Sequence, residues 1–523
     1  MRGSSLWLFP SCGDSELDHR AMRYPLIALV GVIHLYFIWA LGAVIGLDSM
    51  IYAQLGDAIF TGGGLQQFYQ GPRYYIFQHL APGLPILWTS ATILTGSYGW
   101  LLFTVIQHLV AGAALLYLLF VLRHFLSAPF LAAAALLVSC DPLYQSLHNR
   151  LMTESISGSM FLLGLGATID MLRQRAVLVA PLSILTVSGM VAIQFRSQAV
   201  IFFVVFFVAL HFAQDKIVRE ARYWICVLLV VGSVCAWPGY RLAVTGQAFF
   251  PNVSYLALAH ALRYNPDPSE AVIAQLRSLP LPPGLSAETI AKEGVDYTIA
   301  AKMGRQLRVG GLSEREAIAH LSRVAWSVRT DSMQIVKNQL RLPLLSTGLI
   351  YPVFWGDQDE PIHRGFTVRD YSRHVAHWRQ WDGGTLRDDY TQEFEGLLAM
   401  SRNNRQMYDP VVVDELDRRL RPYFVDHSIN LRDPLHLSEI SSDVWLIGWV
   451  GGLWVFWRIH PWALVVLVLP VLANYVTSVS VPIGNPRYGY FLLPMYQIGF
   501  VVIVTRILGR ILNTKSCPRS ALQ

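Results

Sequence analysis

The sequence has little charge and few cysteines for its length. Only 15% of its 523 residues are Asp, Glu, Lys or Arg, and 53% are hydrophobic, whereas a soluble protein carries about 25% charged residues. A soluble globular fold is therefore not expected. The five cysteines indicate neither a disulfide framework nor a cysteine-based zinc site. The chain also lacks a Gly-x-x-x-x-Gly-Lys phosphate loop, a His-Glu-x-x-His motif and a Gly-x-Ser-x-Gly motif.

The charges that are present gather in one part of the chain. Residues 246–440 contain 22 of the 41 Lys and Arg and 24 of the 35 Asp and Glu, and the flanking sequence consists of apolar runs. This pattern predicts a polytopic membrane protein with one large hydrophilic insert. The net charge of +6 fits basic residues at the cytoplasmic ends of spanning helices, so no nucleic-acid partner is expected.

Ten apolar segments approach the length of about 20 residues that a spanning helix needs. They lie at 25–47, 100–122, 128–145, 154–172, 177–195, 197–213, 223–244, 441–458, 461–481 and 488–507. Residues 1–24 lack the apolar core and cleavage site of a secretory signal, so we expect a cytoplasmic N-terminus followed by a retained first helix.

A further apolar stretch, Leu80–Thr95, is short and is interrupted by Pro82 and Pro85. If it does not cross the membrane, the cytoplasmic side collects 14 basic residues and the outer short loops collect five; if it does, the ratio becomes seven to 12. The positive-inside rule favours the first arrangement. We therefore expect a re-entrant or interfacial helix here.

The expected organisation is an N-terminal membrane module at 25–245 with its first outer loop at 48–99, an extracytoplasmic insert at 246–440, C-terminal spans at 441–508 and a cytoplasmic tail at 509–523.

In this topology, ionisable residues gather at the outer ends of the helices. Those that we single out are Asp48, Asp57, Arg73, His79, Asp141, Arg150, Glu154, Arg196 and Arg487. Ionisable groups near membrane depth are costly and usually functional, although each of these residues could instead be solvated at the interface. Asp48 directly follows the first span, and Tyr52 is four residues later on the same helix face. Partial desolvation would raise the pKa of Asp48 toward neutral, which suits a general base.

Three groups of motifs follow one another on this outer face. The first comprises Asp48, Tyr52, Gly62–Gly64 and His79–Pro85; the second comprises Asp141–Tyr144 and Asn149–Glu154; the third comprises Asn485–Tyr488 and Leu492–Pro494. Together they resemble the GT-C class of membrane glycosyltransferases, which includes protein O-mannosyltransferases, lipid A aminoarabinose transferases and mycobacterial arabinosyltransferases. The chain departs from that pattern at Ser49, where many members have a second acid, and at Ala81, where many have proline.

The resemblance implies an all-α GT-C fold and transfer of a sugar from a polyprenyl-phosphate donor to a hydroxyl of a glycan, lipid or protein. Asp48 would be the general base, with inversion at the anomeric carbon. The implied substrate-binding residues are Tyr52, Arg73, His79, Arg150, Glu154, Arg196, Arg487 and Tyr488. Glu154 would orient a substrate or share a divalent cation with Asp48; no other cofactor is implied. The enzyme would lie in a bacterial inner membrane with its site facing the exterior.

In the insert, Ser313 and Glu316 have the spacing of a capping box, which predicts a helix from there to about Leu340. The apolar, proline-broken stretch 342–355 is expected to lie on the membrane. Two other functions stay open. A glycan polymerase or ligase would use a diphosphate-linked donor and would not need an acid after the first helix. A transporter or lipid flippase would show inverted repeats or ionisable groups near mid-membrane.

Overall fold

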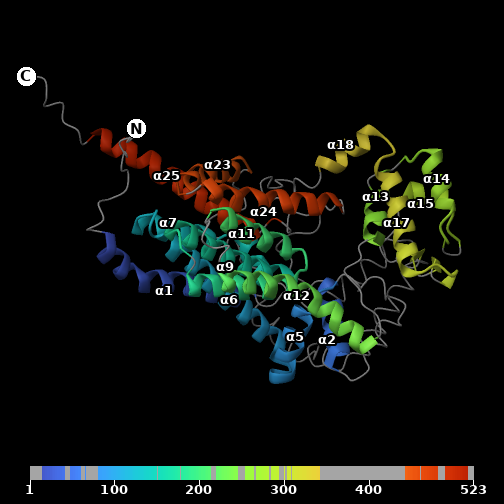
Figure 1. Cartoon of the computed structure of the whole chain (residues 1–523), viewed down its shortest axis with the longest axis horizontal. Coiled ribbons are helices and arrows are strands. Elements are labelled where there is room, and N and C mark those ends of the chain that lie inside the picture. Colours follow the sequence, from blue (N-terminus) through green and yellow to red (C-terminus); the bar gives the residue numbers. More distant parts are fainter. Residues whose placement is uncertain are drawn as a thin grey trace, which may run out of the picture.

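The structure is a computed structural model of the whole chain, in which a series of segments is described. These are residues 15–41, 47–60, 65, 80–149, 151–176, 178–213, 220–245, 254–263, 265, 267–281, 284–293, 300, 303–304, 306–307, 309–341, 442–459, 461–480, 489 and 491–515. Every regular element within them is a helix (Figure 1). The expectation of an all-α protein is therefore confirmed for this part of the chain.

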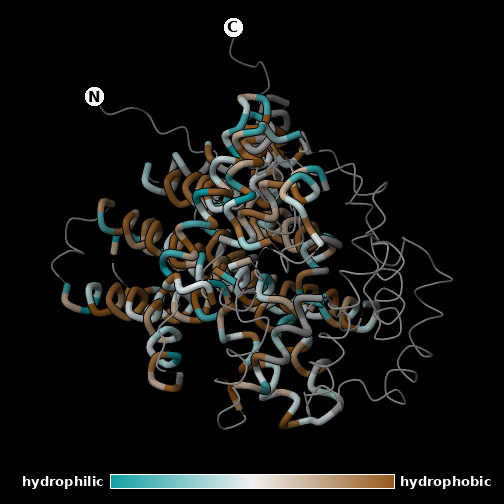
Figure 2. The backbone as a smooth tube through the Cα atoms, turned by 90° about the vertical axis from the view of Figure 1, so that its right-hand side faces the viewer, coloured by the Kyte–Doolittle hydropathy of each residue, from teal (hydrophilic) through white to brown (hydrophobic). Residues whose placement is uncertain are grey.

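Four helices are long and apolar enough to cross a membrane: α1 (Ser15–Leu41), α6 (Gly99–Leu122), α9 (Thr153–Gln174) and α12 (Ala221–Thr245). Figure 2 shows mostly hydrophobic residues along the long helices. The chain is thus an integral membrane protein by the length and composition of these helices.

Helices with shorter apolar stretches occupy the remaining predicted segments. They are α5 (Gly83–Thr95), α7 (Ala128–Ser139), α10 (Val179–Phe195), α11 (Ala199–Ala213), α23 (Ser442–Ile459), α24 (Pro461–Ser480) and α25 (Leu493–Lys515). The apolar windows of these helices are at most 17 residues long in the part of the chain that is described. The number of ten crossings therefore stays a prediction. Helix α5, with 13 residues, is shorter than the about 20 that a crossing needs.

The segment expected as one span at 128–145 is two helices, which corrects the sequence prediction. Helix α7 ends at Ser139, and α8 (Pro142–Asn149) begins after a bend. The Asp141 carboxylate accepts a hydrogen bond from the backbone N–H of Tyr144 at 3.0 Å, which caps the new helix, and proline is favoured at the first helical position. The bend turns the polar residues of α8 into the bundle.

Helix α9 lies at the centre of the bundle and packs against α6, α10 and α11. Its span is 89% buried, whereas those of α1 and α12 are 22% buried. The outer surfaces of α1 and α12 are apolar, with exposed side chains such as Leu35 and Leu228, as expected for helices that face lipid. Residues of α9 are therefore shielded from lipid by the helices around them.

Five short helices of the insert pack together beyond one end of the bundle (Figure 1). They are α13 (Ser254–Arg263), α14 (Glu270–Arg277), α15 (Ala287–Glu293), α17 (Glu314–Arg329) and α18 (Met333–Arg341). The expectation of a mostly helical insert is met in these segments. The stretch 342–355, expected on the membrane, lies outside the described residues.

The capping box at the start of α17 is confirmed. The backbone N–H of Ser313 donates to Glu316 at 2.8 Å, and that of Glu316 donates to the Ser313 hydroxyl at 3.3 Å. The predicted continuation to Leu340 is wrong, because α17 ends at Arg329. The Asp331 carboxylate accepts hydrogen bonds from Asn265 and Ser269, which hold the chain out of helical register before α18 begins.

Candidate functional site

Only part of the predicted site can be placed. Arg73, His79, Arg150, Arg487 and Tyr488 lie outside the described residues. Asp48 is the second residue of α2 (Leu47–Phe60), and its side chain also lies outside the described part. Tyr52 is a buried residue on the same helix, while Glu154 and Arg196 are described together with their contacts.

Glu154 and Arg196 form an ion pair between two neighbouring helices. Arg196 Nη1 lies 3.4 Å from Glu154 Oε1, and the two side chains are 19% and 4% exposed. The hydroxyl of Thr153 donates to Glu154 Oε2 at 3.2 Å, and Arg196 Nε donates to Gln198 at 2.9 Å. The carboxylate is in the first turn of α9 and the guanidinium directly follows α10. Each charge therefore lies at a helix end of opposite partial charge, which is the favourable arrangement. The sequence predicted both residues for the site, and the structure joins them.

Close contacts bring further predicted segments toward this pair. A Cβ atom on Gly83, the first residue of α5, would lie 2.6 Å from Phe195 Cδ2 and 2.7 Å from the backbone oxygen of Gln194. The start of α5 therefore touches the end of α10, directly before Arg196. Gly56 of α2 in turn lies against Thr89 of α5. The glycines allow these helices to approach more closely than any other residue would.

The start of α25 also lies against the first turns of α9. A Cβ atom on Gly158 would lie 2.7 Å from Phe491 Cβ, and Phe491 also packs its ring against Phe161 and Phe202. Gly158 is one turn beyond Glu154 on α9. The start of α5, the end of α10 and the segment before α25 thus meet around the first turns of α9.

Three buried histidines were missed by the sequence analysis. His34 of α1, His108 of α6 and His148 of α8 are at most 5% exposed, with ring centroids 5.2 to 6.0 Å apart. His34 Nδ1 and His108 Nδ1 lie 2.9 Å apart, and His108 Nε2 lies 3.2 Å from the amide oxygen of Asn149. That amide is oriented by its NH₂ group, which donates to the Phe37 carbonyl. Because the amide oxygen only accepts, a neutral His108 carries its proton on Nε2 and accepts from His34.

The histidine cluster is connected to the ion pair through one residue. His148 Nδ1 lies 2.9 Å from the hydroxyl of Ser155, which follows Glu154 in the first turn of α9. Asp141, at the start of α8, accepts a hydrogen bond from Gln497 of α25. Residues from α1, α6, α8, α9 and α25 thus form one buried polar region. The analysis of apolar runs could not find it, because histidines within an apolar segment do not interrupt it.

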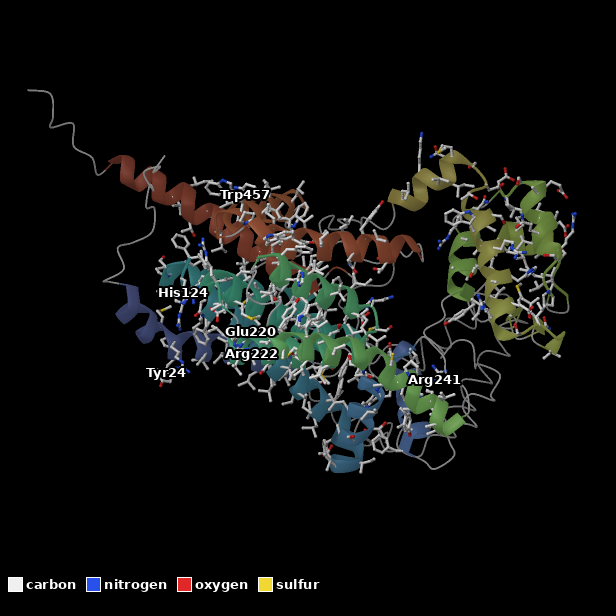
Figure 3. All side chains as sticks on the ribbon, viewed as in Figure 1. Tyr24, His124, Glu220, Arg222, Arg241 and Trp457 are labelled. Atoms are coloured by element: carbon white, nitrogen blue, oxygen red, sulfur yellow. The ribbon has the colours of Figure 1, made fainter. Side chains whose placement is uncertain are left out.

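Arg241 is a second residue that the sequence analysis did not assign to the site. It is fully buried near the end of α12, and its guanidinium carbon lies 6.0 Å from the centroid of the Trp237 ring. Figure 3 places Arg241 at the end of the bundle where α2 lies, whereas His124 lies at the opposite end. A buried guanidinium at the end of a membrane helix is a candidate group for binding an anion.

The described residues offer no ready metal centre. Within them, no group of three His, Cys, Asp or Glu side chains is arranged to hold an ion. The two oxygens of Glu154 face Arg196 and Thr153. Asp48, the carboxylate that the sequence predicted to share a cation with Glu154, lies outside the described side chains, so a shared cation stays a prediction and we derive no step through one.

The fold and the site together define the class of protein: an integral membrane protein, helical in the part of the chain that is described, with a buried ion pair at one end of its bundle. No protein-family model matches the chain, and no curated protein matches it. Among solved structures, a similar one is the archaeal oligosaccharyltransferase AglB from Archaeoglobus fulgidus, in complex with an inhibitory peptide and a dolichol-phosphate. The identity is 12% and the TM-score is 0.38, over 96% of this chain and 53% of AglB. The chain thus spans about half the length of AglB, and a likeness of this size assigns no family.

Proposed function

We propose that the chain is a membrane glycosyltransferase that moves a sugar from a polyprenyl-phosphate donor to an acceptor hydroxyl. The observation that carries the proposal is the meeting of α5, α9, α10 and α25 around Glu154 and Arg196, with α2 packed on α5. Several of the motifs that resemble GT-C enzymes adjoin these helix ends in the sequence. A set of short motifs spread over the chain is thereby supported as one site.

In the proposed reaction, Asp48 accepts the proton of the acceptor hydroxyl. The hydroxyl oxygen attacks the anomeric carbon while the bond between that carbon and the donor phosphate oxygen breaks, which inverts the configuration. The leaving polyprenyl phosphate gains negative charge, and cationic groups placed where this charge develops would lower the barrier. Arg73, His79, Arg150, Arg196 and Arg487 are the candidates from the sequence.

The described contacts suggest separate roles for two arginines. Arg196 is held by Glu154 and by Gln198, so its guanidinium is oriented before a substrate binds. Preorganised donors cost no reorganisation during the reaction. Arg241, which also contacts Trp237, adds a candidate for the donor phosphate, since a guanidinium matches phosphate oxygens with its planar fork. Tyr52 and Tyr488 would position the sugar or the acceptor.

The proposed location is a bacterial inner membrane, with the site and the insert facing the exterior. The acceptor is the hydroxyl of a glycan, a lipid or a protein. A polyprenyl-phosphate donor is itself confined to the bilayer, so a site at the end of the bundle, next to lipid, suits its headgroup.

The test is sugar transfer by membranes that contain equal amounts of wild-type or Asp48→Asn protein, with a panel of radiolabelled polyprenyl-phosphate sugars. Removal of a general base should lower the rate by about a hundredfold or more. Asp170→Asn is the matched control, because Asp170 pairs with Arg173 at the far end of α9 and should leave transfer unchanged. Transfer that survives Asp48→Asn would contradict the assigned base and favour a polymerase or ligase.

A transporter or flippase is the second candidate, and the histidine cluster favours it. His34 and His108 lie within two membrane spans, and ionisable residues inside a membrane often line proton or ion paths. This candidate predicts no sugar transfer by wild-type membranes with any donor. It also predicts movement of a labelled polyprenyl-linked sugar across vesicles that depends on a pH gradient and is lost in His108→Ala.

A further inference from the structure

Helix α18 of the insert ends against a membrane helix. The hydroxyl of Tyr475, on α24, donates a hydrogen bond of 2.9 Å to the backbone oxygen of Leu340. Figure 1 shows α18 reaching back from the other insert helices toward the end of α24. The last turn of α18 is therefore held beside the bundle, within a few residues of the end of α24 at Ser480.

The surface of α24 at this level is apolar and exposed. Leu472 and Val476, on either side of Tyr475 in the sequence, are 49% and 55% exposed. In a protein embedded in a bilayer, such side chains on a peripheral helix are covered by lipid. A tyrosine at this position is also typical of the membrane interface, where its ring is in contact with apolar groups and its hydroxyl with polar ones.

Helix α18 carries an apolar face that no other described helix covers. Met333 is 70% exposed, Leu340 is 45% exposed and Val336 is partly exposed. Their spacing of three and four residues puts them on one side of the helix. Lys337, which is exposed, flanks the same side. An apolar face beside a lysine is the pattern of a helix that lies in the headgroup layer, with the ammonium directed at lipid phosphates.

We propose that α18 docks on the bilayer in which the chain is embedded, with Met333, Val336 and Leu340 in the interface and Lys337 at anionic headgroups. The occupant is lipid because the exposed surface of α24 continues into that of α18 through the bond between Tyr475 and Leu340. Lipid that covers Leu472 and Val476 also reaches Leu340. The insert is thereby attached to the membrane surface as well as to the bundle, whatever reaction the chain catalyses.

The test uses the full chain in nanodiscs that contain phosphatidylethanolamine and phosphatidylglycerol. The five native cysteines are replaced by alanine, and single nitroxide labels are attached at Met333→Cys or Leu340→Cys. Leu472→Cys is the lipid reference and Ser322→Cys, an exposed position on α17, is the water reference. Relaxation by oxygen reports lipid, and relaxation by a soluble nickel chelate reports water.

We expect the labels at both α18 positions to have accessibilities close to that at position 472 and several-fold different from that at 322. Labels at 333 or 340 that match the water reference would overturn the proposal. Val336→Cys replaces either variant if it fails to give a monodisperse protein. In discs with phosphatidylglycerol, Lys337→Glu should shift the label at 333 toward water, and in discs of phosphatidylcholine alone it should not. An equal shift in both lipids would contradict the contact of Lys337 with anionic headgroups.

Discussion

Arg196 and Glu154 form an ion pair across the interface of α9 and α10, with the carboxylate almost fully buried and the guanidinium partly in solvent. The Glu154 carboxylate depends on the ion pair more than the Arg196 guanidinium does, because water reaches the carboxylate less. Its other oxygen is bonded to Thr153. Removing Arg196 would take one cation away from a carboxylate that is almost fully buried.

Arg196→Gln should therefore lower the free energy of unfolding by about 3 kcal/mol, as found when one member of a buried pair is removed. The double variant Glu154→Gln with Arg196→Gln should recover most of this loss, because the buried negative charge is removed together with the cation. Denaturation of the protein in detergent, followed by the fluorescence of its tryptophans, would measure both. The control is Arg173→Gln, which breaks the partly exposed pair with Asp170 one turn away on the same helix and should cost about 0.5 kcal/mol. Equal losses in the two arginine variants would contradict the burial of Glu154.

The contact between His148 and Ser155 makes a second prediction. Ser155→Ala removes the partner of a fully buried imidazole nitrogen, and a buried polar atom left unsatisfied costs about 1 to 3 kcal/mol. Ser159→Ala is the matched control, because the Ser159 hydroxyl bonds only within its own helix, to the Ser155 carbonyl, and should cost little. Thermal denaturation of the two variants would compare them. A loss no greater than that of the control would show that His148 does not depend on Ser155.

The helices of the bundle could be predicted from apolar runs, and the start of α17 from the Ser313–Glu316 spacing, because both signals are local. The end of α17 could not, since it is set by hydrogen bonds from Asn265 and Ser269 to Asp331. The break between α7 and α8 had a local signal, an Asp followed by Pro142, which the long apolar run outweighed.

The same distinction applies to the site. Glu154 and Arg196 were each predicted from their position at a helix end. Their ion pair could not be predicted, because it depends on how α9 and α10 pack. The histidine cluster joins α1, α6 and α8, and its members are far apart in the sequence. Nothing in the residues around His34 or His108 indicates a partner, so only the packing of the helices reveals the cluster.

Gly83 provides a prediction about the approach of α5 to α10. A Cβ atom there would lie well inside contact distance of a backbone oxygen, which cannot turn away as a side chain would. Gly83→Ala should thus push α5 away from Arg196 and destabilise the protein by about 1 to 3 kcal/mol. Gly232→Ala is the control, because nothing lies within 4 Å of its Cβ position on α12. Thermal denaturation checks stability, and equal effects of the two variants would contradict the close approach.

The insert offers a prediction about pH that is independent of the membrane site. Arg277 donates hydrogen bonds to Glu288, and with the backbone N–H and Ser286 it lowers the pKa of that carboxyl from 4.5 to about 2. Because the charged form is favoured in the folded protein, the interaction stabilises the insert above pH 4.5. This stabilisation is lost as the pH falls from about 4.5 toward 2.

Arg277→Gln should raise the pKa of Glu288 back toward 4.5, since the largest cause of its lowering is removed. The measurement is a carbon NMR titration of the full chain in nanodiscs with ¹³C-labelled glutamate, in which Glu288→Gln identifies the signal. Arg315→Gln, a change at another exposed arginine of the insert, should leave the titration of Glu288 where it is. A wild-type Glu288 that titrates near 4.5 would show that the bond from Arg277 does not persist in solution, and α14 and α15 would then be joined by their apolar contacts alone.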